Sequence, residues 1–517
     1  MTFEIVFVLL SLLGMMAALI ADKMRPGMVL FSVVVLFLCV GILTPKEMLE
    51  GFSNKGMITV ALLFLVSEGI RQSGTLGQVI KKLLPQGKTT VFKAQLRILP
   101  SVAFISAFLN NTPVVVIFAP IIKHWAKSVK LPATKFLIPL SYVTILGGIC
   151  TLIGTSTNLV VHGMILEAGY EGFTMFELGK VGIFIAIAGI IYLFIFSKRL
   201  LPDARPDTAV PDEEVEEGEK LHRVEAVLGA RFPGINKKLS DFNFQRHYGA
   251  EVKEIKTRNG QRYVDHLEDV VLREGDTLVV MADDTFIPTW GESSVFVLLT
   301  NGNDPDTSGK KKRWLALILL VLMIVGATVG ELPATKEMFP DIKLDMFFFV
   351  CITTIIMAWT NIFPARKYTK YISWDILITI ACAFAISKAM VNSGVADCVA
   401  GFIIGLSDDY GPHVLLAILF VITNLFTELI TNNAAAALAF PLALSISAQL
   451  GVSPTPFFVV ICMAASASFS TPIGYQTNLI VQGIGNYKFT DFVKIGLPLN
   501  IIVFLLSIFL IPLFWKF

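Results

Sequence analysis

Three segments of this chain occur twice, and this internal repeat restricts the possible folds more than any other feature of the sequence. The copies lie 320 or 321 residues apart and pair 51–74 with 371–394, 106–120 with 427–441, and 151–163 with 471–483. The third pair is TLIGTSTNLVVHG in the first copy and TPIGYQTNLIVQG in the second. Both copies keep the same polar residues: Thr151, Thr157 and Asn158 in the first, and Thr471, Thr477 and Asn478 in the second.

The composition places this repeat in a membrane. Of 517 residues, 54% are hydrophobic and 16% are charged. Many apolar runs reach the roughly 18–20 residues that span a bilayer. Polar residues are costly in lipid and are tolerated where they face a transport route, so polar positions repeated at matching depths indicate a transporter. The net charge of +2 gives no indication of nucleic-acid binding, and we expect membrane lipid and a small solute as partners.

The apolar runs predict an α-helical polytopic membrane protein. They predict ten crossings, of which the fourth and ninth are broken: 3–21, 27–44, 57–73, 136–166, 179–197, 313–330, 345–362, 374–392, 456–485 and 491–514. Two further apolar stretches, 96–125 and 412–449, are interrupted by the polar segments Leu109–Pro113 and Thr431–Asn433. Non-helical backbone at membrane depth is tolerated only where it is buried in protein or lines a cavity. We therefore predict one re-entrant hairpin in each half.

The distribution of basic residues predicts the orientation. Lys and Arg gather in alternate loops, including 71–97 and 123–135, whereas 167–177 has none. The positive-inside rule then places the basic loops in the cytoplasm and both termini outside the inner (plasma) membrane. Five crossings in each half mean that the second half is inserted upside down, which is the inverted repeat of many secondary transporters.

A polar segment separates the two halves. We predict a Pro- and acid-rich linker at 202–220, a small cytosolic α+β domain at 221–290 and a second linker at 291–311. The membrane repeats then cover 1–201 and 312–517.

The sequence of the small domain predicts a sheet. The expected strands and hairpin turn are 224–227, 251–256, 277–281 and Asn259-Gly260. The segment resembles the C-terminal domain of regulator-of-K⁺-conductance proteins (TrkA-C type) in Gly234 before Leu239, in YGAEV at Tyr248–Val252 and in REGDTLVV at Arg273–Val280. In relatives this domain is cytosolic, often dimerises and sometimes binds a small ligand. Both a packing module and a ligand sensor are consistent with this copy.

The hairpin tips offer chemistry for binding ions. A helix broken in the membrane has unpaired N–H groups at one new end, which favour an anion, and unpaired C=O groups at the other, which favour a cation. An Asn side chain supplies both donors and an acceptor. A single Asn at this depth more often only joins two helices. Two Asn-containing tips, together with two matching Thr-x-Ile-Gly-x-x-Thr-Asn loops, instead favour a site that holds an anion between the tips and a small cation beside each.

The membrane part resembles the divalent anion/sodium symporter family, which transports sulfate or di- and tricarboxylates with Na⁺. The family's hallmark is a Ser-Asn-Thr triplet at each hairpin tip. Aligning the halves on Pro120 and Pro441 sets Asn110-Asn111-Thr112 opposite Thr431-Asn432-Asn433. The resemblance implies a homodimer in which a mobile transport part moves past a scaffold like an elevator.

The resemblance also implies roles for individual residues. It assigns substrate binding to Asn111, Thr112, Thr155, Asn432, Asn433 and Tyr475. It assigns Na⁺ binding to Ser106, Asn110, Asn111 and Gly154 in the first half and to Thr427, Thr431, Asn432 and Gly474 in the second. The two glycines contribute backbone carbonyls, and ligation by oxygen alone suits Na⁺ better than a transition metal.

Two departures from the family pattern bear on the substrate. Ser156 and Gln476 stand where the family usually has Pro, and Tyr475 is larger than the usual hydroxyl residue. A bulky side chain shrinks the cavity and favours a small tetrahedral anion such as sulfate over citrate. The TrkA-C-like domain favours sulfate as well, since some relatives that carry it transport sulfate. Succinate-like dicarboxylates, arsenite-type substrates, coupling to H⁺ and export instead of uptake remain open.

The sequence favours symport over other classes of function. A channel gated by the TrkA-C-like domain is disfavoured because the repeat contains no carbonyl filter of the TVGYG type. An anion sensor that signals through the small domain differs from a transporter only in lacking accumulation against a gradient. An enzyme is not indicated, since the sequence shows no nucleophile–base pair, phosphate loop or metal cluster.

Overall fold

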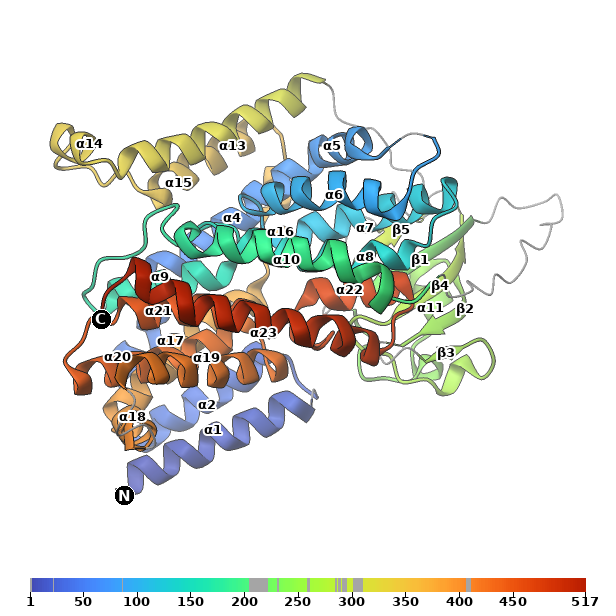
Figure 1. Ribbon diagram of the computed structural model, residues 1–517. Coiled ribbons are helices and arrows are strands. Elements are labelled where there is room, and N and C mark those ends of the chain that lie inside the picture. Colours follow the sequence, from blue (N-terminus) through green and yellow to red (C-terminus); the bar gives the residue numbers. More distant parts are fainter. Residues whose placement is uncertain are drawn as a thin grey trace, which may run out of the picture.

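The computed structural model consists mainly of helices, with one small sheet inserted between two helical halves (Figure 1). It describes residues 2–21, 23–85, 87–203, 222–229, 232–257, 261–283, 286, 290, 295–300, 310–405 and 411–517. Both chain ends lie on the side of the helical bundle opposite the inserted sheet (Figure 1).

Each half runs through the same order of elements. The helices of the first half are α1 (Phe3–Ala21), α2 (Pro26–Val40), α3 (Pro45–Glu50), α4 (Lys55–Gln72), α5 (Thr75–Leu83), α6 (Val91–Ser106), α7 (Asn111–Ser128), α8 (Leu137–Gly148), α9 (Ser156–Glu167) and α10 (Gly179–Leu200). Those of the second half are α13 (Lys310–Gly330), α14 (Pro333–Met338), α15 (Met346–Trp359), α16 (Tyr368–Tyr371), α17 (Trp374–Asn392), α18 (Val395–Gly405), α19 (Gly411–Leu429), α20 (Asn432–Leu450), α21 (Thr455–Ser466), α22 (Gln476–Gly485) and α23 (Phe489–Phe514). Helices α2 to α10 thus correspond one by one to α15 to α23, so the sequence repeat extends to the secondary structure.

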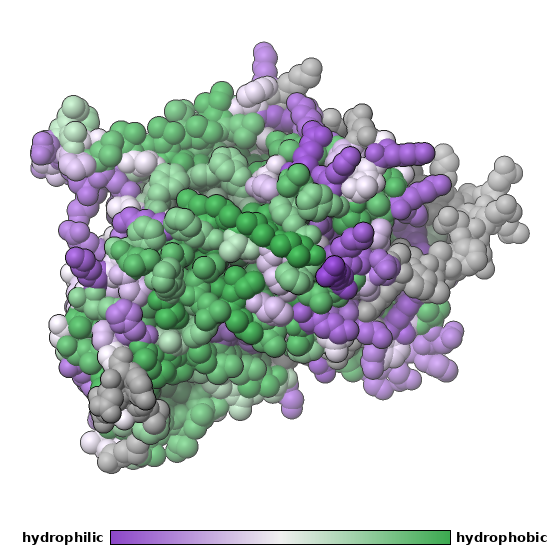
Figure 2. All heavy atoms as spheres, in the orientation of Figure 1, coloured by the Kyte–Doolittle hydropathy of each residue, from purple (hydrophilic) through white to green (hydrophobic). Residues whose placement is uncertain are grey.

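The helices make this chain a polytopic membrane protein. Among the described residues, eight helices are long and apolar enough to span a membrane, and five shorter apolar helices accompany them. Figure 2 shows hydrophobic residues over the broad middle of the visible face and hydrophilic residues gathered at the end that carries the inserted sheet. Helices α19 and α20 are among the eight, although their stretch was predicted to re-enter. Length alone does not decide their course, and the re-entrant course stays a prediction.

The four predicted interruptions of helices are confirmed. Helix α6 ends at Ser106 before α7 begins at Asn111, and α19 ends at Leu429 before α20 begins at Asn432. The two broken crossings are also divided, with non-helical backbone over 149–155 and 467–475. The short helices α3, α5, α14, α16 and α18 were not predicted, because none is long enough to be read as a membrane crossing.

The inserted sheet has five antiparallel strands in the order β3-β2-β4-β1-β5. The strands are β1 (His222–Leu228), β2 (Glu251–Lys256), β3 (Arg262–Tyr263), β4 (Thr277–Ala282) and β5 (Phe296–Thr300), and the short helix α11 (Phe244–Tyr248) precedes β2. The three predicted strands are confirmed as β1, β2 and β4. Strand β5 lies within the stretch 291–311 that was expected to be a linker. The predicted turn Asn259-Gly260 and residues 204–220 of the first linker lie outside the described residues, although β2 and β3 do pair on either side of that turn.

The sheet has its own hydrophobic core. Phe232, Phe242, Tyr248 and Phe296 pack together there, with aromatic ring centroids 5.0 to 6.1 Å apart. Val227 of β1 is an exception, because it is buried in the core of the membrane helices. The inserted domain is therefore packed directly on the membrane part.

Candidate functional site

The hairpin tips have nearly the same internal hydrogen bonds in both halves. Ser106, at the end of α6, donates from Oγ to Asn111 Oδ1 over 2.8 Å. Thr427, near the end of α19, donates from Oγ1 to Asn432 Oδ1 over 2.7 Å. All four side chains are at least nine-tenths buried. Each tip thus holds a hydroxyl and an amide oxygen together by a hydrogen bond between two neutral side chains.

The non-helical segments of the broken crossings are also stabilised in the same way in both halves. Asn158 Nδ2 donates to Thr151 O over 2.8 Å, and Asn478 Nδ2 donates to Thr471 O over 3.1 Å. The Thr151 and Thr471 hydroxyls in turn bond the carbonyl oxygens of Ala107 and Glu428 at the hairpins. These four residues, which were predicted only as repeat-matched polar positions, hold the loops in place against the tips.

Each tip reaches across to the broken crossing of the other half. Thr112 Oγ1 lies 3.4 Å from Gln476 Oε1, and Asn433 Oδ1 accepts from Ser156 Oγ and Thr157 Oγ1 over 3.2 and 3.1 Å. Lipid offers no hydrogen-bond partners to polar groups at membrane depth. These contacts supply such partners from the protein itself. The site is therefore built jointly by the two halves.

The hydroxyl of Tyr475 lies where the two tips meet. Asn111 Nδ2 donates to it over 2.6 Å, Thr155 Oγ1 lies 3.1 Å from it, and Asn432 also hydrogen-bonds with it. The phenol thus joins Asn111 and Asn432 to Thr155 in the non-helical segment 149–155. That its size limits the substrate stays a prediction.

The predicted cation ligands are brought together in two groups of neutral oxygen atoms. The first contains Ser106, Asn111 and the neighbouring Gly154, and the second contains Thr427, Asn432 and Gly474. A Cβ on Gly474 would lie 2.5 Å from Thr427 O, so only glycine allows this approach. An uncharged all-oxygen donor set fits a hard monovalent cation.

Asn110 and Thr431 occupy the N-cap positions of α7 and α20. Neither makes a side-chain cap hydrogen bond. The Thr431 hydroxyl is buried and has no hydrogen-bond partner among the described residues. A buried polar atom without a partner is costly, and this oxygen is available to a ligand that enters the site.

Two helix residues at the site were missed by the sequence repeat because their counterparts differ in chemistry. Ser141 Oγ of α8 donates to Asn478 Oδ1 over 2.6 Å and lies 2.9 Å from the Thr477 hydroxyl. Asn500 of α23 donates to the Glu428 carboxylate over 2.8 Å. That carboxylate also accepts from the backbone N–H groups of Ser470 and Thr471 over 2.9 and 3.0 Å. Polar residues within apolar helices were the only signal that could have found them.

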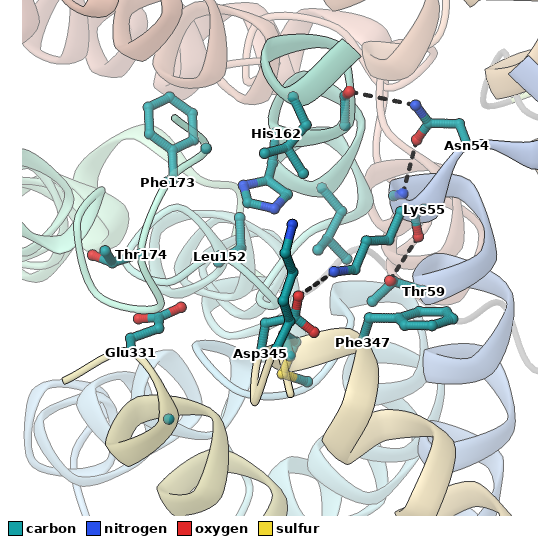
Figure 3. Close-up of a pocket in the computed structure, with 18 of the residues that line it drawn as sticks. Asn54, Lys55, Thr59, Leu152, His162, Phe173, Thr174, Glu331, Asp345 and Phe347 are labelled. Atoms are coloured by element: carbon teal, nitrogen blue, oxygen red, sulfur yellow. Dashed lines mark hydrogen bonds and ion pairs between the residues drawn. The ribbon is translucent and has the colours of Figure 1, made fainter. Parts of the chain in front are cut away.

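A cavity of about 1040 Å³ lies away from the tips, between α4, α9 and the segment that joins α13 to α15. Figure 3 shows Lys55 extending toward Asp345, with which it forms an ion pair, and His162 facing the same cavity from α9. None of the predicted substrate-binding residues lines it. The residues predicted to bind substrate thus form a largely buried cluster, separate from this cavity.

Comparison with known proteins decides the family. A family model described as "Citrate transporter" matches residues 16–446 and 338–517. The chain belongs to the citrate transporter family. It is a transporter of the divalent anion/sodium symporter type, as its hairpin motifs implied, and not an enzyme.

Similar proteins of known sequence agree with this family membership. An "Uncharacterized transporter" of Synechocystis is 29% identical, covering 93% of this chain and 92% of its own length. A "Putative sulfur deprivation response regulator" of Chlamydomonas reinhardtii is 28% identical, covering 94% and 98%. The "Probable sodium/sulfate cotransporter 3" of the same alga is 31% identical, but the match covers 56% of this chain and only 32% of the cotransporter.

Proposed function

We propose that this citrate transporter family member couples the entry of Na⁺ to the uptake of a small divalent anion, with sulfate as the first choice. The observation that carries the proposal is the meeting of two neutral tips, Asn111 and Asn432, at the Tyr475 hydroxyl. Amide N–H groups there can donate to an anion, while the hydroxyl and carbonyl oxygens beside each tip can accept a cation. The name of the algal sodium/sulfate cotransporter supports Na⁺ and sulfate as the two transported ions.

Sodium would be held by Ser106, Asn110, Asn111 and Gly154 in one group and by Thr427, Thr431, Asn432 and Gly474 in the other. When bound, it supplies positive charge beside an anion site that has none of its own. Asn111 and Asn432 belong to both the cation and the anion sites. Because each ligand then raises the affinity for the other by the same factor, the anion is held firmly only when Na⁺ is present.

Tyr475 supports a small substrate. Its hydroxyl already bonds to Asn111, Thr155 and Asn432, so an anion must fit beside the phenol or displace it. Thr112 and Asn433, at the outer edges of the tips, complete the anion-binding set. Sulfate requires less space than succinate, malate or citrate, although the family name keeps a dicarboxylate or tricarboxylate as the alternative substrate.

The movement that we propose is an elevator motion of an inverted repeat. The hairpins and broken crossings (α6–α9 and α19–α22) form the mobile part, and the other membrane helices form the scaffold, in a homodimer. The contacts of each tip with the opposite half support such a repeat. We place the inserted TrkA-C-like domain in the cytoplasm and both chain ends outside. Their positions on opposite sides of the bundle support this (Figure 1).

A transporter-like anion sensor is the second candidate. The relative named as a sulfur deprivation response regulator matches nearly this whole chain, which favours a signalling role for at least one similar protein. A sensor binds the anion without accumulating it. Binding of a small ligand by the inserted domain is compatible with both a transporter and a sensor.

The decisive experiment measures uptake of radiolabelled sulfate into proteoliposomes. We expect accumulation with an inward Na⁺ gradient, none when choline replaces Na⁺, and no effect of excess succinate. Inhibition by succinate would move the substrate to dicarboxylates. Saturable binding of sulfate without accumulation in either medium would favour the sensor.

The site assignment predicts that Asn111→Ala and Asn432→Ala each reduce Na⁺-driven uptake by about a hundredfold, because each variant removes ligands for both ions. Uptake and size-exclusion profiles of the purified variants test this. Asn392→Ala is the matched control, since Asn392 is an amide of α17 that bonds Ile42 O and Glu47 instead of the site. Normal uptake by either tip variant would remove the assignment.

A further inference from the structure

Equivalent glycines of the two halves have different neighbours. Gly163 of α9 and Gly483 of α22 occupy the same place in the sequence repeat. Helix α9 packs against α4, and a Cβ on Gly163 would lie 2.5 Å from Oδ1 of Asn54, the residue that caps α4. Asn54 Nδ2 also donates to Gly163 O over 3.4 Å. In the first half, this glycine therefore lets the mobile part dock on the scaffold.

In the second half, the inserted domain takes that place. A Cβ on Gly483 would lie 2.5 Å from Thr277 Oγ1 at the start of β4, and Leu479 of α22 lies against Gly275. Thr277 is fully buried. Helix α17, which corresponds to α4, has no comparable packing with α22, and both helices are described throughout. The domain thus covers on α22 the face that the scaffold covers on α9.

Charged groups hold the domain in this position. Lys123, near the end of α7, forms an ion pair with Glu225 of β1 at 2.9 Å. Lys256 of β2 pairs with the same carboxylate at 3.2 Å. The Glu225 and Lys256 side chains are 15% and 6% exposed, so solvent screens the pairs only weakly. One of these two lysines belongs to the mobile part and the other to the domain.

We propose that the inserted domain is an autoinhibitory element that must release α22 before the carrier can reach its other end state. In transporters built from inverted repeats, we expect each half to adopt, in the second end state, the contacts that the other half makes in the first. The exchange requires α17 to cover the Gly483 face as α4 now covers Gly163. This inference rests on the proposed alternating-access function.

The residues of α17 that would reach Gly483 are suited to fill the vacated space. Trp374 and Ile376 are the repeat counterparts of Asn54 and Gly56. Both carry larger side chains than their counterparts, and Trp374 is 47% exposed in the present arrangement. They can therefore occupy the volume that Thr277 now fills. The domain and the scaffold cannot both contact Gly483 at once.

A reversible cross-link tests the proposal. The pair Thr277→Cys and Gly483→Cys is introduced into a protein in which the exposed Cys39 is replaced by Ser. Because release would be blocked, oxidation should lower Na⁺-driven sulfate uptake about tenfold or more, and reduction should restore it. An oxidised protein that transports at the rate of the reduced protein would overturn the proposal.

The control pair joins two strands within the domain. Glu251 of β2 lies opposite Met281 of β4, so Glu251→Cys with Met281→Cys forms a disulfide that does not touch α22. Oxidation of this pair should leave uptake unchanged. Equal inhibition by both disulfides would show that stiffening of the domain, and not its attachment to α22, stops transport, and would overturn the proposal.

Lys123→Gln gives a second test that does not need a disulfide. It removes the attraction between α7 and the domain and leaves the Glu225–Lys256 pair within the domain. We expect faster initial uptake at an unchanged KM for sulfate, and faster amide exchange over 476–485. Slower uptake or unchanged exchange would contradict a restraining role. Amide exchange reports the docking of the domain without requiring transport. If the protein accumulates no sulfate, the proposed function fails, but the exchange measurement still shows whether Lys123 holds the domain on α7 and α22.

Discussion

At the scale of single residues, Tyr475 controls both the assembly of the site and its size. Tyr475→Thr reproduces the residue of the first half, Thr155, and opens the space between the tips. We expect succinate to inhibit sulfate uptake at concentrations about tenfold lower in this variant, because one well-fitted interaction of roughly 1.4 kcal/mol has that effect. Inhibition curves for native protein and variant measure the change.

Tyr475→Phe separates the size of the ring from its hydroxyl. It keeps the bulk and removes the bonds to Asn111, Thr155 and Asn432. We expect weaker sulfate uptake with no gain of succinate inhibition. If the Phe and Thr variants admit succinate equally, the ring does not limit the substrate.

The repeat made some of these residues predictable. Asn111 and Asn432 stand out because both copies keep them in a polar break, whereas the junction of Tyr475 with Asn111 spans 364 residues and joins positions that do not correspond. Ser141 could not be predicted, since a serine in an apolar helix has many possible partners. Local patterns thus identify the tips, but packing decides what each tip contacts.

At the scale of elements, the close approach of α9 to α4 depends on glycine. Gly163→Ala places a methyl group 2.5 Å from Asn54 Oδ1, and such overpacking costs about 1–3 kcal/mol. We expect a lower thermal unfolding temperature. Gly14→Ala in α1 is the control, because no atom lies within 4 Å of its added Cβ. Equal unfolding temperatures for both variants would show that the approach is not tight.

Elements differ in how clearly the sequence marks them. Long apolar runs predicted the membrane helices, and the strands β1, β2 and β4 alternate or cluster apolar residues clearly enough to be found. Strand β5 was missed because its stretch, 296–300, precedes a polar segment and joins the sheet only through β1.

At the scale of the whole molecule, the attachment of the inserted domain should depend on acid. Burial alone raises the pKa of Glu225, but Lys123 and Lys256 outweigh it and lower the pKa to about 2. A carboxyl with a lowered pKa contributes its full stabilisation above its ordinary value near 4.3 and loses it as the pH falls toward 2. We expect the protection of the backbone amides of 476–485, measured relative to their intrinsic exchange rates at each pH, to fall across this interval.

Glu225→Gln is the control for the acid effect. It removes the titrating group, so docking should be weaker at neutral pH and nearly independent of pH down to about 3. The same pH profile in native protein and variant would show that another group governs the attachment.

The contacts between each tip and the opposite half have a consequence for biogenesis. Ribosomes deliver the first half to the translocon well before Asn433, Gln476 and Asn478 have been made. Until then Thr112, Ser141, Ser156 and Thr157 lack the partners that they bond in the finished protein. Unpaired polar groups are poorly tolerated in lipid, so the first half has to wait in a protected environment. The membrane insertion machinery, or a chaperone beside it, must therefore shelter this half until the second arrives.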